Sequence, residues 1–387
     1  MHRTSDRVAT IPAPRSNAAP WWRTATVYRA YLPSFADGNG DGIGDLIGLR
    51  ERVGYLVLLG VDAVSLSGLL TEPDPRSGAT APGVDRAAGG LPELDAFIGE
   101  AHDQGLKVIL EGPAGVVDGM ERTLRFWLDR GIDGFRAAGG DKARLRRLLE
   151  EYPARALVGT VDTGDDAAGP QQRLQYEVAR SSWNSAALTA AVNHAMGGGE
   201  TPTWALSDRG LRRPVSRHGA GPLGERRARA LALLQLALPG AVEICAGDEL
   251  ALPDVVGLDL RDDSWVPLPW AGEKPPYEFT RQDASWLPIP EGWVDRTVES
   301  QLEDAGSMLS LYRQALELRQ SSPAASGDGI EWYGAPDGCL ALRRTGGLIC
   351  AVNTTTVPVP LPPGTLLLSS VPLVDGSLPG DATAWLS

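Results

Sequence analysis

Residues 46–67, LIGLRERVGYLVLLGVDAVSLS, contain the unit from which the rest of the fold can be inferred. Apolar residues recur at helical spacing as far as Leu59, and Gly60 is of the residue type that most often ends a helix. The run that follows, AVSLS at 63–67, has the length of a buried strand. The segment therefore predicts a helix over 46–59 and a strand directly after it.

The same unit recurs on both sides of this segment. The stretches near 92–105 and 119–130 have helical spacing and end at Gly105 and Gly131. Further helices are expected near 141–151, 185–196 and 225–238. Strands are expected at 26–31, 63–67, 107–111, 134–138, 156–161, 174–179, 203–208 and 242–247.

Eight strands that alternate with helices favour an α/β fold of the (β/α)8 TIM-barrel type. A doubly wound sheet is the competing architecture. It is disfavoured because no GxGxxG motif follows any of the expected strands.

The pattern changes after a last helix over 306–320. Residues 326–387 show little helical periodicity, and short strands at 339–344, 348–353 and 365–371 alternate with Gly, Pro and Thr turns. We expect a disordered segment over 1–20, the barrel over 21–325 and an antiparallel β-domain over 326–387. The Trp- and Pro-rich stretch 261–295 is expected to form an ordered excursion over the barrel.

Composition narrows the classes of function. The chain has 387 residues and a net charge of −13, which argues against a nucleic-acid or anionic-membrane surface. No apolar run approaches the roughly 18 residues of a membrane span, and no secretory signal is evident at the N-terminus. Cys245, Cys339 and Cys350 have no metal-binding spacing and fit a reducing compartment, so the expected location is the cytoplasm.

One segment is specific enough to indicate a family. Residues 21–46, which include FADGNGDGIGDL at 35–46, resemble the opening of the α-amylase family of glycoside hydrolases, in its α-glucosidase and oligo-1,6-glucosidase branch. The resemblance continues through FWLDRGIDGFR at 126–136, TWALS at 203–207 and GDEL at 247–250. It covers nearly everything from Trp21 onward, and it implies the barrel and the C-terminal β-domain expected above.

The positions that would carry the family's chemistry have lost their carboxylates. The family uses an aspartate nucleophile after strand four, a glutamate acid/base after strand five and a further aspartate after strand seven. The corresponding positions here are Ala138, Thr160 and Gly210. Retaining hydrolysis needs two carboxylates about 5 Å apart, and methyl or hydroxyl groups cannot replace them.

A second loss concerns the wall of the sugar pocket. Family members insert a subdomain after strand three, whereas here only a short turn leads from Glu111 to the helix near Gly119. The pocket-forming subdomain is therefore missing, and we expect a shallow, wet site. The chain is interpreted as a degenerate, non-hydrolytic relative.

Three charged residues are expected at the mouth of the barrel. Arg136 pairs with catalytic carboxylates in the family, and an unpaired buried guanidinium is costly. Glu111 and Asp208 could replace the missing partners. The three would form either a structural ion-pair cluster or a residual site with altered chemistry.

The loop 37–45 is a candidate metal site. Asp37, Asn39, Asp41, Ile43 and Asp45 offer an oxygen at every second position, with Ile43 contributing its carbonyl. Position twelve is glycine, which disfavours an EF-hand. The family resemblance implies a structural calcium ion here, and the alternative is a Gly-rich turn with no metal.

Several other side chains have simpler interpretations. Asp248 and Glu249 are expected to support the mouth without doing chemistry. Most of the tryptophans that could stack on sugars are expected to be packing residues: Trp204, Trp265, Trp270, Trp286 and Trp293. His218 is expected to lie on the surface or in a loop.

Three functions remain open at this point. The first is a non-catalytic binding, scaffold or regulatory protein. Its partner would be another protein, such as an active relative, and a sugar or another small molecule could be a further ligand. The second is an enzyme with different chemistry at Glu111, Arg136 and Asp208. The third is weak α-glucoside hydrolysis in carbohydrate metabolism.

Overall fold

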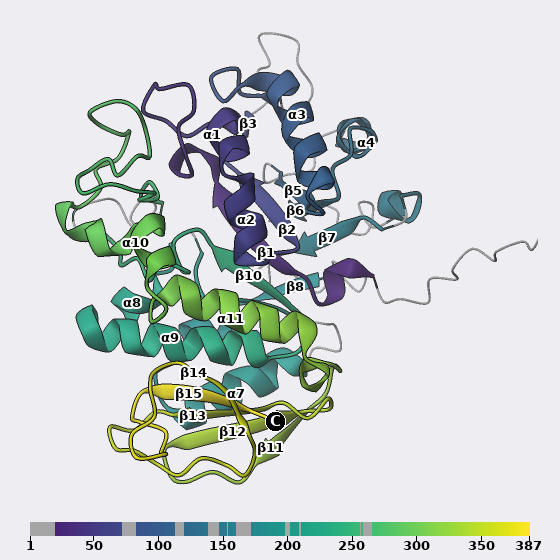
Figure 1. Ribbon diagram of the computed structural model, residues 1–387. Helices are drawn as coiled ribbons and strands as arrows, with labels where there is room; N and C mark the ends of the chain where they lie inside the picture. The colour runs from purple at the N-terminus through teal and green to yellow at the C-terminus, as the bar shows by residue number, and fades with distance from the viewer. Residues whose placement is uncertain are drawn as a thin grey trace, which may run out of the picture.

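The computed structural model describes residues 20–71, 83–112, 120–137, 147–152, 154–159, 172–197, 202–208, 210–255, 257 and 265–387. The predicted N-terminal segment lies outside these residues, apart from Pro20. Figure 1 shows the barrel elements above the C-terminal sheet, which lies at the bottom of the view.

Eight parallel strands form a closed barrel in the order β1-β10-β9-β8-β7-β6-β5-β2. The ring closes where Thr26 pairs with Val242. The strands are β1 (Thr26–Tyr31), β2 (Ala63–Ser67), β5 (Lys107–Glu111), β6 (Gly134–Ala137), β7 (Ala156–Gly159), β8 (Gln172–Gln175), β9 (Pro202–Ala205) and β10 (Ala241–Cys245). The predicted TIM barrel is confirmed.

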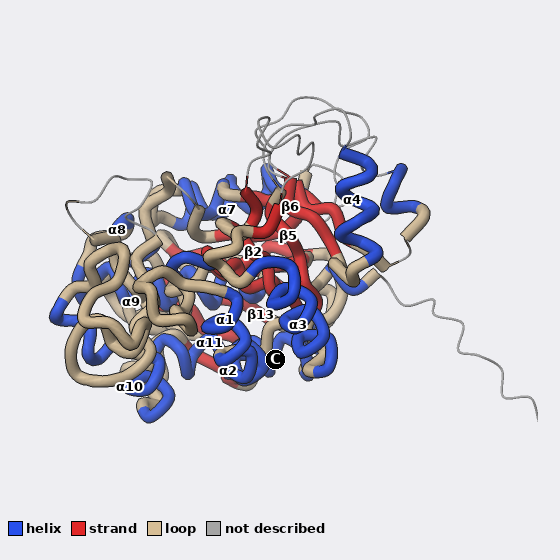
Figure 2. Tube along the Cα trace, turned by 90° about the horizontal axis from the view of Figure 1, so that it is seen from above, coloured by secondary structure: helices blue, strands red, loops and turns tan. Residues whose placement is uncertain are grey.

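Helices surround this ring, and Figure 2 shows α1, α2 and α3 side by side along one side of the central strands. The helix predicted over 46–59 is interrupted at Arg52 (φ −111°, ψ 9°). The helices are α1 (Leu46–Glu51), α2 (Val53–Leu59), α3 (Gly90–Asp103), α4 (Met120–Asp129), α6 (Glu177–Arg180), α7 (Ser185–Met196), α8 (Pro214–Arg217), α9 (Gly221–Ala237), α10 (Val298–Glu303) and α11 (Met308–Ser321).

The sixth strand is displaced from its predicted position at 174–179. It occupies Gln172–Gln175, and the chain turns into helix α6 at Glu177. The alternation of apolar residues over so few positions does not separate a strand from one helical turn. The helical turn buries Val178 and Ala179, which is why the apolar residues are there.

The interior of the barrel is apolar at one end. Val27, Ala63 and Ile109 pack together with Ala25 near the N-terminal ends of the strands. Alternate residues of a strand face the same side. The next inward-facing residue after Val27 on β1 is therefore Arg29, and the next after Ile109 on β5 is Glu111. The interior of the barrel thus becomes charged towards the mouth.

The C-terminal sheet is antiparallel, in the order β11-β12-β13-β15-β14. Its strands are β11 (Ile330–Tyr333), β12 (Cys339–Arg344), β13 (Ile349–Asn353), β14 (Leu366–Ser369) and β15 (Ala382–Leu386), of which β11 and β15 were not predicted. Fully buried Trp385 donates its indole N–H to the carbonyl of Leu233 on α9 at 3.0 Å. This contact joins the sheet to the barrel, while the exact domain boundaries stay a prediction.

Short elements complete the fold: 3-10 helices η1 (Trp21–Arg23), η2 (Leu32–Ser34), η3 (Glu291–Arg296) and η4 (Pro323–Ala325), and the two-stranded sheet of β3 (Leu70–Thr71) and β4 (Gly83–Val84). The predicted excursion is described from Trp265 onward. It buries Trp265, Trp270, Tyr277 and Phe279.

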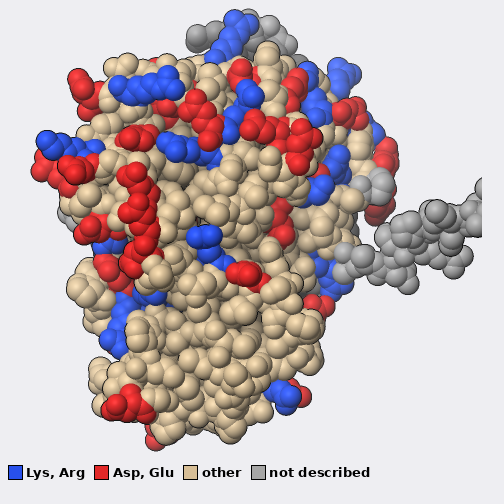
Figure 3. All heavy atoms as spheres, viewed as in Figure 1, with Lys and Arg blue, Asp and Glu red and all other residues tan. Residues whose placement is uncertain are grey.

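Charged side chains are unevenly spread over the face drawn in Figure 3. Acidic and basic groups are interleaved over the barrel helices, and few lie over the C-terminal sheet below them. Within the described ranges, no helix combines the length and the apolar character that a membrane crossing requires.

Candidate functional site

The mouth of the barrel holds a network of charged side chains centred on two buried arginines. Arg29, on β1, forms a two-pronged contact with Glu111 of β5: its Nε lies 3.1 Å from Oε2 and its Nη2 lies 2.9 Å from Oε1. The same guanidinium donates from Nη1 to the carboxylate of Asp208, which follows β9. Arg29 is only 3% exposed, so these bonds are shielded from water.

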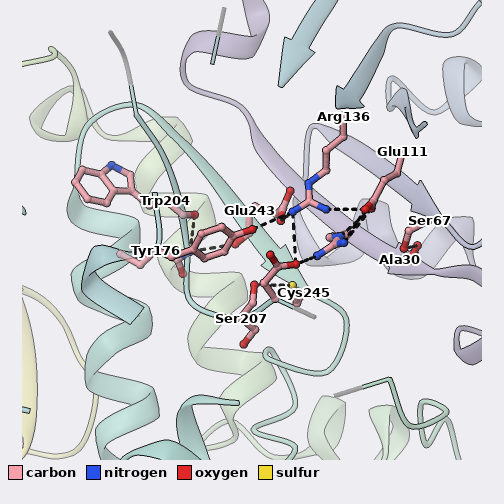
Figure 4. A network of polar contacts seen from close by, with 12 residues as sticks. Ala30, Ser67, Glu111, Arg136, Tyr176, Trp204, Ser207, Glu243 and Cys245 are labelled. Carbon is pink, nitrogen blue, oxygen red and sulfur yellow. Dashed lines mark hydrogen bonds and ion pairs between the residues drawn. The ribbon is translucent and has the colours of Figure 1, made fainter. Parts of the chain in front are cut away.

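Arg136, on β6, is the second centre of the network. Its Nη1 lies 3.0 Å from Oε1 of Glu111, and its Nη2 lies 3.7 Å from Oδ1 of Asp208. The same Nη2 lies 3.3 Å from Oε1 of Glu243 on β10 and donates to the hydroxyl of Tyr176 at 2.9 Å. Figure 4 shows Arg136, Glu111 and Glu243, which come from three different strands, converging with Tyr176, which directly follows β8.

The structure thus brings Glu111, Arg136 and Asp208 together, as the sequence predicted. It adds Arg29, Glu243 and Tyr176, which sequence reasoning missed. Period-two alternation could have indicated two of them, because Arg29 is two residues from Val27 and Glu243 is two residues from Ala241. Tyr176 could not be identified from the sequence, because it meets Arg136 only once the strands have closed into the barrel.

Two of the acids stay ionised. Burial opposes ionisation of Glu111, but Arg29 and Arg136 outweigh it and lower the pKa of this carboxyl below its ordinary value. The pKa of Asp208 is lowered for the same reason, by the same two arginines. A carboxylate held in this way has no proton to donate to a leaving group at neutral pH.

Glu243 differs from these two acids. Burial raises the pKa of its carboxyl, although Arg136 and Arg29 act in the opposite direction. The residue is only 2% exposed and lies inside the ring of strands, so its carboxyl is not presented to a substrate. Its role in the network is to balance the charge of the arginines.

The positions of the family's carboxylates can be followed only in part. Ala138 and Thr160 lie outside the described residues. Gly210 is exposed and has a left-handed backbone (φ +81°). Strand β5 ends at Glu111 and helix α4 begins at Met120, so eight residues connect them and the expected loss of a subdomain at this point is confirmed.

The loop predicted to bind calcium is held by its own hydrogen bonds. Asp37 accepts the backbone N–H groups of Gly40 at 2.6 Å and Gly42 at 2.7 Å. Asp45 caps helix α1 by accepting the N–H of Gly48 at 2.7 Å. Among the residues that the structure describes, no three acidic, His or Cys side chains are placed to hold a metal ion. The predicted ligands Asn39, Asp41 and Ile43 are exposed and do not complete such a group.

Calcium binding at this loop therefore stays a prediction, and a calorimetric titration with calcium tests it. The family resemblance leads us to expect that calcium binds at one site, with a measurable heat of binding, and raises the melting temperature. A sample in which Asp37→Asn removes one carboxylate is the control and should bind more weakly. No heat and an unchanged melting temperature would leave the hydrogen-bonded turn as the whole explanation of the loop.

The predicted supporting roles of other residues agree with their burial. Glu249 is fully buried and accepts the hydroxyl groups of Tyr28 at 2.7 Å and Tyr55 at 2.8 Å. Asp248 is held by Arg213 at 3.1 Å. Four of the five tryptophans considered as sugar platforms are buried packing residues: Trp204, Trp265, Trp270 and Trp293.

His218 lies in the turn after helix α8, which agrees with its predicted place in a loop, but it is buried and not on the surface. It is 6% exposed, directly after helix α8, and its ring lies 6.1 Å from that of Trp183. Burial, together with Arg217 and Arg227, lowers the pKa of the imidazole to about 4. The sequence could not show this, because the packing partner Trp183 is remote in the chain.

We expect His218 to make stability depend on pH. As pH falls below about 6.5, the ordinary pKa of histidine, the unfolded chain binds a proton before the folded one does. Stability should therefore decrease by about 2–3 kcal/mol between pH 6.5 and 4, and His218→Gln should flatten this part of the profile. Urea unfolding at a series of pH values measures it. An identical slope in the variant would contradict the assignment.

Comparisons with known proteins place these features in context. Residues 29–112 match the pattern described as the α-amylase catalytic domain. A probable α-glucosidase of Rhizobium meliloti is 25% identical over 500 aligned positions, which cover 86% of this chain and 89% of that protein. An oligo-1,6-glucosidase of Heyndrickxia coagulans is 36% identical over 94 residues, which cover 24% of this chain and 17% of that enzyme.

Solved structures agree on the fold. An α-glucosyl transfer enzyme superposes with a TM-score of 0.81 at 23% identity, covering 96% of this chain and 100% of that one. The trehalose-6-phosphate hydrolase of Bacillus licheniformis gives a TM-score of 0.79 at 16% identity, covering 95% and 99%. At these identities the likeness establishes the architecture alone.

Proposed function

Because this chain is a relative of the α-amylase family of glycoside hydrolases, in its α-glucosidase and oligo-1,6-glucosidase branch, we propose that it is a member that binds without hydrolysing. Its role would be that of a binding, scaffold or regulatory protein in the cytoplasm. Two observations support this proposal: the contacts of the charged residues at the mouth, and the residues that the sequence has at the positions predicted to correspond to the family's carboxylates.

The observation that carries the proposal is the position of the two arginines. Arg29 and Arg136 each contact both Glu111 and Asp208, so positive guanidinium groups lie between the two acids. Retaining hydrolysis requires two acids facing each other across the sugar, one of them protonated. Here both are ionised and engaged, which suits a structural ion-pair network.

The names of the relatives favour a second candidate, hydrolysis of α-glucosides. The compared proteins include a probable α-glucosidase, an oligo-1,6-glucosidase and a trehalose-6-phosphate hydrolase, and no comparison supports an inactive chain. Altered chemistry at the mouth is a third candidate, because Glu111, Arg136 and Asp208 do meet there. The side chains favour the first candidate and the names of the relatives favour the second.

Turnover of an aryl α-glucoside separates the candidates. The proposal expects none above background, whereas turnover that follows the protein through purification would support the second candidate. If turnover is absent, affinity capture from the native host with mass spectrometry would identify the protein partner or small molecule that the proposal requires.

A further inference from the structure

A cavity lies at the end of the barrel opposite to the mouth. Its volume is about 500 Å³, and it is lined by the start of β1, the turn before β2, the end of α11 and the end of β12. The lining includes the side chains of Thr24, Asp62, Arg319, Ser321 and Arg344. Cavities of this size accommodate a small metabolite.

Arg344 is the most unusual group in this cavity. It is 3% exposed, and its Nη2 donates to the carbonyl of Gly327 at 2.6 Å. Its Nε is buried and has no hydrogen-bond partner within the described ranges. In the part of the chain that the structure describes, Arg344 also has no acidic partner within 4.0 Å. The carboxylate of Asp328 attracts it from a greater distance, and that carboxylate forms an ion pair with Arg23. A buried guanidinium left in this condition is unfavourable unless something anionic joins it.

Arg319 adds a second positive charge. Its guanidinium donates to the carbonyls of Leu236 at 2.5 Å and Leu238 at 2.8 Å, and to that of Gly240. These carbonyls satisfy its hydrogen bonds but not its charge. Burial, with a smaller contribution from the nearby positive charge of Arg344, lowers the pKa of Arg319 to about 9.

The opposing charge in the cavity is incomplete. Asp62 is the acidic lining residue, and its Oδ2 accepts the backbone N–H of Thr26 at 2.7 Å. Two arginines against one aspartate leave a charge of +1 in a chain whose net charge is −13. The hydroxyl group of Thr24 supplies a further donor, whereas that of Ser321 already donates to the carbonyl of Glu317 at 2.7 Å.

From this arrangement, we propose that the cavity binds a phosphoryl group, held by Arg344 and Arg319. A phosphate offers three acceptor oxygens to the guanidinium of Arg344 and to the hydroxyl group of Thr24, and its negative charge neutralises the two cations. The volume leaves room for the organic part of a phosphomonoester. This site is independent of the mouth and of the proposed function.

Calorimetric titration of the full chain with inorganic phosphate and with glucose 6-phosphate tests the proposal. Glucose and sodium chloride at matched ionic strength are the controls. We expect both phosphates to bind and to raise the melting temperature, and glucose to do neither. Tighter binding of the ester by tenfold or more would identify a phosphorylated metabolite as the ligand, and equal affinity would identify free phosphate.

Variants locate the site. Arg344→Met should weaken phosphate binding by about tenfold or more, since a hydrogen bond to a charged group contributes about 1.5–3 kcal/mol. Because this variant removes a buried side chain, Ser321→Glu provides a second one: it adds a negative charge at an exposed position of the lining and should also weaken binding. Arg281→Met, at an exposed arginine, should bind as the unmodified chain does.

Two results would overturn the proposal. One is the absence of heat and of any melting shift with either phosphate at concentrations up to about 10 mM, well into the range of weak binding. The other is binding that Arg344→Met and Ser321→Glu leave unchanged, which would place the anion elsewhere on the chain.

Discussion

Replacing Arg136 by methionine is expected to lower the free energy of unfolding by about 3–5 kcal/mol, the usual cost of removing one partner from a buried charge pair. The guanidinium is 3% exposed and contacts Glu111 at 3.0 Å and Glu243 at 3.3 Å. In its absence Glu243, only 2% exposed, would keep Arg29 as its remaining nearby cation. Urea unfolding with an unchanged m-value would measure the loss.

Two further variants show whether the loss comes from unpaired charge. Arg281→Met breaks an exposed pair with Glu51 at 3.8 Å and should change stability by less than about 1 kcal/mol. Adding Glu243→Met to Arg136→Met should restore part of the lost stability, because the buried acid is removed with its cation. A loss below about 1 kcal/mol in Arg136→Met would mean that the network does not hold the mouth together.

The second large effect concerns catalysis. We expect aryl α-glucosides to be hydrolysed at least about 10⁴-fold more slowly than by an active relative, the typical cost of losing members of a catalytic unit. By the family resemblance, Ala138, Thr160 and Gly210 are predicted to occupy the positions of the family's carboxylates. Glu111 and Asp208 are both engaged by arginines. Steady-state assays of the two proteins side by side measure the ratio.

A restored variant shows how much depends on the missing acids alone. Ala138→Asp, Thr160→Glu and Gly210→Asp together should still leave activity near background, because the subdomain that walls the pocket is absent and Arg29 remains between the other acids. Activity in this variant approaching that of the relative would show that the rest of the site is intact.

The architecture was predictable because it depends on local signals. Helices that end at Gly60 and Gly105, followed at once by short apolar strands, repeat often enough to specify a barrel. Errors arose where the run was short. The segment 174–179 alternates like a strand, yet tertiary packing folds its second half as helix α6.

The site was only half predictable, because its remaining members are defined by long-range contacts. Glu111 and Arg136 could be identified from the family motifs. Arg29 lies in the same strand as apolar residues, and nothing local shows that it meets Asp208, 179 residues away. The burial of His218 could not be predicted for the same reason, since the ring of Trp183, which packs against it, is remote in the chain.

Hydrolysis of an aryl α-glucoside by the purified, unmodified chain at micromolar concentration tests the central claim most directly. The account predicts a rate equal to that of a mock purification, and no dependence on protein concentration. A rate proportional to protein concentration that survives a second purification and is lost in Glu111→Gln or Asp208→Asn would contradict it, and would identify the mouth as a working catalytic site.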